Sequence, residues 1–142
     1  MADLTADRDA IRHLLARYTY NGDRGRIEEL AACFCEDGIL EYPGNCATGP
    51  RAVAAVLSQD RNEGGPAPTF VRHHITNPLI ETDGDIATAR SYFTVVSDSG
   101  PDHSGTYNDR LVRTANGWLF SHRLVRIDWQ SSSSLFRRMT TR

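Results

Sequence analysis

Two adjacent histidines, His73 and His74, lie in a run of apolar and β-branched residues that is typical of a strand. Imidazole titrates near neutral pH, so a histidine at the wall of a cavity is suited to proton transfer. Successive side chains of a strand point to opposite faces, so both rings can reach one site only if a bulge intervenes. This argues against a metal site formed by the two rings, and we expect no metal.

The flanking residues predict which of the two rings faces inward. The more apolar of the two alternating sets carries no permanent charge and consists of Val71, His73, Ile75, Asn77 and Leu79. The other set carries Arg72 and His74. We therefore expect His73 to face the interior and His74 to face outward. An inward imidazole without a hydrogen-bond partner would cost about 1 to 3 kcal/mol, and Tyr18 and Asp23 are the best partners.

Each of these residues also has a purely structural interpretation. A single inward histidine in a strand is more often a hydrogen-bonded core residue than a catalyst. Asp23 is adequately explained as a helix cap, and Tyr18 alone would be a core residue. The sequence pattern leaves these alternatives open.

Three helices are expected to position these groups. Residues 5–21 carry the helical stripe Ile11, Leu14, Leu15 and Tyr18, and Asn21-Gly22 supplies a left-handed stop. Asp23 follows as the expected N-cap of a second helix, whose inward residues are Ile27, Leu30, Ala31 and Phe34. A third helix is predicted over 48–59, with Pro50 in its first turn.

The rest of the chain is predicted to be strand. A short strand at 37–42 precedes the third helix, and the later strands are expected at 69–81, 85–97, 104–114 and 118–129. Asp83-Gly84 and Asn116-Gly117 are two-residue hairpin turns, whereas 97–105 is predicted to be a loop at the rim of the sheet. Helices followed by long antiparallel strands define an α+β fold, with the helices on one face of the sheet.

Composition narrows the classes of function. The chain has 142 residues, 39% of them hydrophobic, and a formal net charge of -2. We expect one domain over 1–129 with a tail at 130–142, mobile or covering the pocket. Without a basic field or a long apolar run, neither nucleic acid nor membrane is an expected partner, and a cytoplasmic location is predicted. The odd set Cys33, Cys35 and Cys46 fits no common zinc spacing and is expected to be reduced.

Three blocks of the sequence together resemble a known family. They are "IRHLLARYTYNGDRGRIEELAACFCEDGILEYPG", "HHITNPLIETDGDIATARSYF" and "GTYNDRLVRTANGWLFSHRLVRIDW". Their order and content resemble the SnoaL-like branch of the nuclear transport factor 2-like superfamily over about residues 5–129. The resemblance implies a cone-shaped fold, with three helices packed in a strongly curved antiparallel sheet that encloses a pocket.

The resemblance also implies roles for individual residues. The polar triad is similar to that of bile acid 7-alpha dehydratase and, less closely, scytalone dehydratase. In such enzymes an aspartate after the first helix holds a catalytic histidine, which places Asp23 and His73 in those roles and Tyr18 as the assisting tyrosine. A related dehydrochlorinase has lysine at the position of Tyr18, which makes haloalkane elimination a poorer fit. No cofactor is implied.

The implied activity is that of a cofactor-independent lyase or isomerase, foremost a dehydratase, with His73 as a base held by Asp23 and Tyr18 as a donor to the substrate oxygen. We expect an apolar pocket for a steroid, terpenoid, polyketide or aromatic substrate, lined by Tyr42, Val53, Leu57, Val71, Phe93, Trp118 and His122. His122 and Asp109 are candidates for a second polar group of the site, but Asp109 lies among several arginines and is explained at least as well by a structural ion pair. The alternatives are a noncatalytic ligand- or protein-binding module, such as a dioxygenase small subunit, and a polyketide cyclase.

An assembly of two or three copies is also implied by the resemblance. The outer face of the sheet would form the contact in a homodimer or homotrimer. We expect the alternating set on the last strand to lie on that face; it consists of Leu119, Ser121, Arg123, Val125 and Ile127.

Overall fold

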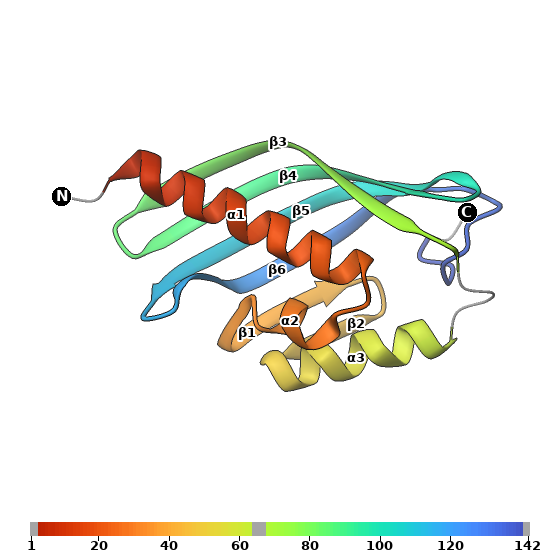
Figure 1. Cartoon of the computed structure of the whole chain (residues 1–142), viewed down its shortest axis with the longest axis horizontal. Coiled ribbons are helices and arrows are strands. Elements are labelled where there is room, and N and C mark those ends of the chain that lie inside the picture. Colours follow the sequence, from red (N-terminus) through yellow and green to blue (C-terminus); the bar gives the residue numbers. More distant parts are fainter. Residues whose placement is uncertain (1–2, 64–67, 141–142) are drawn as a thin grey trace.

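The protein is an α+β domain with one six-stranded sheet and three helices (Figure 1). The computed structural model describes residues 3–63 and 68–140. Its elements are α1 (Leu4–Asp23), α2 (Ile27–Ala31), β1 (Phe34–Tyr42), β2 (Asn45–Thr48), α3 (Pro50–Glu63), β3 (Val71–Asp83), β4 (Ile86–Ser97), β5 (Gly100–Thr114) and β6 (Gly117–Gln130). The strand order is β2-β1-β6-β5-β4-β3. All neighbours are antiparallel except β1 and β6, which are parallel, so the prediction of a purely antiparallel sheet is wrong for that pair.

Helix α1 begins and packs as its sequence pattern predicts. The Asp3 carboxylate accepts hydrogen bonds from the backbone N–H groups of Thr5 and Ala6, which caps the first turn. The predicted stripe from Ile11 to Tyr18 is buried against the sheet. Figure 1 shows α1 running across one face of the sheet, from the β3–β4 hairpin toward β1 and α3.

The corner after α1 differs from the prediction. The helix continues through Gly22 and Asp23, and the left-handed residue is Gly25, with φ 73°. A Cβ on Gly22 would lie 3.0 Å from a methyl carbon of Leu30, so Gly22 allows α2 to pack closely rather than ending α1. Asp23 therefore belongs to the last turn of α1 and does not cap α2. Phe34, predicted in the second helix, is the first residue of β1.

The long strands follow their predicted order, with two differences at their ends. The hairpin turns at Asp83-Gly84 and near Asn116-Gly117 are confirmed, with Gly84 and Gly117 at positive φ. The predicted loop at 97–105 is wrong, because β4 turns sharply into β5 and the strand starts at Gly100. The sequence also gave no indication of β2, and α3 runs beyond the predicted end at 59.

A bulge in β3 reverses the alternation that the sequence predicts. His73 and Ile75 face inward, and His74 faces outward, as expected. Between Thr76 and Leu79 the pairing with β4 shifts, and Asn77 adopts φ 56°. Beyond this bulge the parity is inverted: Ile80 is 5% exposed and Leu79 is 50% exposed. The prediction that Asn77 and Leu79 face inward is therefore wrong.

A second bulge has the same effect on β6. Leu111 pairs with Phe120 and Arg110 with His122, so Ser121 is the extra residue. Arg123 is consequently fully buried, and Val125 and Ile127 lie on the inner face. The set predicted for an outer contact face thus turns inward from Arg123 onward.

The core lies between the helices and the inner face of the sheet. Its largest fully buried apolar side chains include Ile11, Leu14, Leu40, Leu111 and Phe120. A smaller cluster of Phe93, Val95 and Tyr107 extends this core toward the far end of the strands. Within the described parts of the chain, no helix has the length and apolar character needed to cross a bilayer.

Candidate functional site

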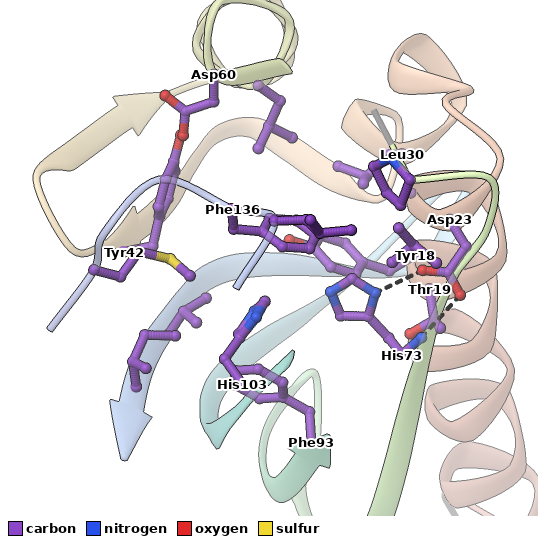
Figure 2. Close-up of a pocket in the computed structure, with 18 of the residues that line it drawn as sticks. Tyr18, Thr19, Asp23, Leu30, Tyr42, Asp60, His73, Phe93, His103 and Phe136 are labelled. Carbon is purple, nitrogen blue, oxygen red and sulfur yellow. Dashed lines mark hydrogen bonds and ion pairs between the residues drawn. The ribbon is translucent and has the colours of Figure 1, made fainter. Parts of the chain in front are cut away.

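A cavity of about 450 Å³ lies between the helices and the sheet, beside the smaller core cluster. Such a volume is typical of sites for small organic ligands. The predicted residues that line it are Tyr18, Asp23, Tyr42, Leu57, Val71, His73 and Phe93. Apolar side chains from β6 and from the tail complete the wall, so the cavity presents a mostly apolar surface with a few polar groups (Figure 2).

Asp23 and His73 form a closely bonded pair at one end of this cavity. The Nδ1 atom of His73 lies 2.6 Å from Oδ1 of Asp23, and the backbone N–H of His73 donates to Oδ2 at 3.0 Å. One carboxylate thus fixes both the strand position and the ring orientation. Figure 2 shows the second ring nitrogen of His73 directed away from Asp23 and into the cavity.

The bonding pattern defines what His73 can do chemically. With its Nδ1 hydrogen donated to the Asp23 carboxylate, a neutral imidazole carries its free lone pair on Nε2. The side chain of Asp23 is 8% exposed and that of His73 is 24% exposed. The carboxylate is therefore shielded while the ring remains accessible from the cavity, which is the arrangement of a positioned base.

Tyr18 lies on the same wall but is held by a different set of contacts. Its ring packs edge-on against Phe34, Tyr107 and Phe120. Burial raises the pKa of its hydroxyl, so Tyr18 remains a proton-bearing donor. The guanidinium of Arg123 lies 4.2 Å from the Tyr18 ring centroid.

Arg123 occupies a closed aromatic cage with Asp109. Two hydrogen bonds of 2.8 and 3.0 Å join its guanidinium to the Asp109 carboxylate, and both side chains are almost fully buried. Although burial acts to lower the pKa of Arg123, the Asp109 carboxylate holds that pKa above its ordinary value. The predicted ion pair of Asp109 is confirmed, with Arg123 as its partner.

Three residues predicted to line the pocket lie elsewhere. Val53 is fully buried in the main core. Trp118 is buried beside α1, where its indole N–H donates to Asp7 at 3.2 Å. His122 pairs with Glu41 at 3.1 Å, and both side chains are partly exposed. None of the three contacts the cavity.

A second histidine–aspartate pair was not predicted. Nδ1 of His103 lies 2.7 Å from Oδ1 of Asp102, and both residues are buried. The His103 ring lines the cavity, with its centroid 6.4 Å from that of His73. Two imidazoles, each held by its own carboxylate, therefore border one cavity.

A bulge explains why two adjacent residues of β5 both face inward. Val95 pairs with His103 and Val96 with Pro101, so Asp102 is the extra residue. The sequence prediction placed this segment in a loop and therefore gave these residues no orientation. The sequence feature that indicates them is the adjacency of an aspartate and a histidine. It received no role because the segment was predicted to be a loop.

The electrostatic state of this second pair follows from its burial. Burial lowers the pKa of His103, with Asp102 opposing this effect. Although burial acts to raise the pKa of Asp102, hydrogen bonds from Ser134 and His103 hold it below its ordinary value. His103 is therefore a neutral ring whose Nε2 accepts hydrogen bonds.

The tail at residues 131–140, which we call the strap, packs against the cavity. Asp102 accepts hydrogen bonds from the Ser134 hydroxyl at 2.6 Å and the Leu135 backbone N–H at 2.8 Å. The Phe136 ring contacts His103 edge-on, with centroids 4.8 Å apart. Arg137 reaches the carbonyl of Pro43 and the carboxylate of Asp60. The strap thus forms one side of the cavity wall.

No group of three or more metal-ligating side chains is gathered within residues 3–63 and 68–140. The two histidines that line the cavity are instead each hydrogen-bonded to one carboxylate.

The structure is thus an α+β domain with helices packed on one face of a sheet and a histidine–aspartate pair at the cavity between them. The family comparison identifies it: the model of the SnoaL-like domain matches residues 3–124, and the chain belongs to that family. Solved structures with the nuclear transport factor 2-like, cystatin-like fold resemble it over most of its length. No match was found among the curated proteins.

Three of the similar solved structures comprise two proteins of unknown function and one with a proposed activity. A Mycobacterium tuberculosis protein of unknown function, solved as an Asp-to-Asn variant, is 32% identical, with 87% of this chain and 72% of that chain covered and a TM-score of 0.73. A Nostoc punctiforme protein of unknown function is 25% identical, with 90% and 96% covered and a TM-score of 0.81. A proposed scytalone dehydratase from Novosphingobium aromaticivorans is 28% identical, with 89% and 87% covered and a TM-score of 0.76.

Proposed function

We propose that this protein is a cofactor-independent lyase, specifically a dehydratase that removes water from a small hydrophobic substrate. The observation that carries the proposal is the Asp23–His73 pair, whose free ring nitrogen faces an apolar cavity of about 450 Å³. The likeness to a proposed scytalone dehydratase supports the same reaction class.

The proposed reaction uses groups that already line the cavity. Nε2 of His73 takes a proton from the carbon next to a substrate carbonyl, and Asp23 stabilises the resulting imidazolium. The carbon–hydrogen electron pair forms the new double bond as the carbon–oxygen bond to the hydroxyl breaks. The imidazolium returns the proton to the departing hydroxyl, which leaves as water.

The remaining polar groups orient the substrate in this proposal. Tyr18 donates to the carbonyl oxygen as negative charge develops on it. His103, neutral and with an accepting Nε2, binds a substrate hydroxyl. The same base would also support the aldol closure of a polyketide cyclase, so the product is what separates these two reactions.

The test compares His73→Ala and Asp23→Asn with the matched control His74→Ala. His74 is the adjacent residue and faces outward. Each protein is incubated with hydroxyketones of the aromatic, polyketide, terpenoid and steroid classes, and products lacking one water are detected by mass spectrometry. We expect the two site variants to lose about 10²- to 10⁴-fold in rate and His74→Ala to match the wild type.

Two outcomes would contradict the proposal. Full turnover by a folded His73→Ala variant would remove the base from the mechanism. Binding of these compounds without turnover by the wild type would favour the noncatalytic binding module. The unfilled cavity weighs only against a purely structural or protein-binding domain, which would be expected to fill that space with side chains.

A further inference from the structure

Besides its two histidine–aspartate pairs, the cavity has a third polar group of residues, across from the Asp23–His73 pair. It consists of Tyr42 at the end of β1, Asp60 on α3 and Arg137 in the strap, all of which line the cavity. The Tyr42 hydroxyl donates to Oδ2 of Asp60 at 2.7 Å, and Nε of Arg137 lies 3.4 Å from the same oxygen. Figure 2 shows Tyr42 and Asp60 on the opposite side of the cavity from Asp23 and His73. We call these three residues the distal cluster.

The distal cluster retains unused hydrogen-bonding capacity. Among the described residues, no hydrogen bond engages Oδ1 of Asp60 or Nη1 of Arg137. Burial and the neighbouring Asp60 carboxylate both raise the pKa of Tyr42. This hydroxyl therefore stays protonated and uses its hydrogen in the bond to Asp60. One acceptor oxygen and one donor nitrogen therefore have no partner among the described residues, and both belong to side chains that line the cavity.

The paired charges define which ligand group fits there. A ligand carboxylate would be attracted by the Arg137 guanidinium but repelled by the Asp60 carboxylate. A ligand ammonium would be attracted by Asp60 but repelled by Arg137. A hydroxyl both donates and accepts one hydrogen bond, so it can satisfy Asp60 and Arg137 together without adding charge. The side chains of Asp60 and Arg137 are 24% and 30% exposed, so the cluster lies at the rim of the cavity.

Apart from the ring of His103, most other side chains that line the cavity are apolar. They include Leu57 from α3, Ile127 from β6 and Phe136 from the strap. A ligand that reaches both ends must therefore place an apolar body along these side chains.

We infer that the cavity selects a ligand with an apolar ring body that carries a hydroxyl group, alcoholic or phenolic, at the end remote from His73, bound by Asp60 and Arg137. The inference rests on the proposed function and narrows its substrate class. Because Arg137 belongs to the strap, this hydroxyl also links the ligand to the segment that forms one side of the cavity.

The test uses 2-naphthol and naphthalene, which differ by one hydroxyl. The dissociation constant of each is measured by NMR titration for the wild type, Asp60→Ala, Arg137→Leu and the control Arg138→Leu. Arg138 is the next strap residue, is exposed, and donates to a backbone carbonyl of the strap. We expect 2-naphthol to bind the wild type and Arg138→Leu about tenfold more tightly than naphthalene, and this ratio to fall to about one in Asp60→Ala and Arg137→Leu.

The ratio separates recognition from a merely structural role. A loosened strap would weaken both probes equally and leave the ratio unchanged. An absent preference in the wild type, or one that survives both distal substitutions, would overturn the inference, since the hydroxyl would then be bound elsewhere or not at all. His73→Ala should keep the ratio, so loss of turnover in that variant tests the proposed reaction independently.

Discussion

At the scale of single residues, the site depends on carboxylates that orient imidazoles. Asp23 binds both the backbone and the ring of His73, and Asp102 binds His103 together with two groups of the strap. Sequence alternation correctly separated His73 from His74, because a regular strand allows only one of two neighbours to face inward. The pairing of His103 with Asp102 depends on a bulge and could not be read from alternation.

The buried His103 should make stability depend on pH. Its pKa in the folded protein lies below the ordinary value of 6.5, because burial penalises the charged ring. As pH falls through 6.5, this histidine becomes protonated in the unfolded chain but stays neutral in the folded protein. The free energy of unfolding should therefore decrease until the pH reaches the pKa of folded His103. Urea unfolding of the wild type between about pH 5 and pH 8 measures this slope.

His103→Gln should flatten that part of the pH dependence, whatever its effect on absolute stability. His13→Gln provides the control, since His13 is exposed on α1 and should leave the slope unchanged. An identical slope in wild type and His103→Gln would show that His103 is protonated equally in both states.

At the scale of elements, bulges decide which residues reach the cavity. The one in β3 inverts parity after Thr76, the one at Asp102 turns two neighbours inward, and the one at Ser121 buries Arg123. A bulge inserts a single residue and leaves the apolar pattern on either side intact. The sequence therefore predicted the strands themselves much better than the faces of their later residues.

Close approach of β5 and β6 at Gly105 makes one substitution especially costly. A Cβ at this position would lie 1.8 Å from the carbonyl oxygen of Arg126, which is backbone and cannot rotate away. We expect Gly105→Ala to lower the free energy of unfolding by about 2 to 3 kcal/mol, because the strands must separate to admit the methyl group. Urea unfolding measures the change.

Ser104→Ala is the control for this prediction. Ser104 is the adjacent, partly exposed residue of the same strand, and its substitution should change the free energy of unfolding by less than about 0.5 kcal/mol. Equal stability of Gly105→Ala and the wild type would mean that β6 can shift away from β5 at no cost.

At the scale of the whole molecule, Arg123 links α1 to the sheet. Its guanidinium lies 3.8 Å from the Tyr107 ring centroid and 4.4 Å from that of Phe120, in addition to its contact with Tyr18. Nη1 of Arg123 has no hydrogen-bond partner among the described residues. The cation is thus held by one carboxylate and by the faces of aromatic rings.

Removal of this cation should destabilise the entire fold. Arg123→Leu leaves the Asp109 carboxylate buried and unpaired, at a cost of about 3 to 5 kcal/mol in the free energy of unfolding. The double variant Arg123→Leu with Asp109→Leu should recover much of that loss, since neither charge remains. Thermal and urea unfolding of both variants checks this, and a double variant no more stable than Arg123→Leu would contradict it.

The sequence by itself determined the family, the order of the helices and long strands, and the inward orientation of His73, because these depend on local periodicity and short motifs. It also predicted that Asp23, 50 positions away, would be a partner of His73, although Asp23 lies in the last turn of α1 and not at a cap. Only the tertiary structure decided that β1 runs parallel to β6, that His103 and Asp102 border the cavity, and that the strap brings Arg137 to Asp60. Those features depend on bulges and long-range packing, which join residues that no local pattern relates.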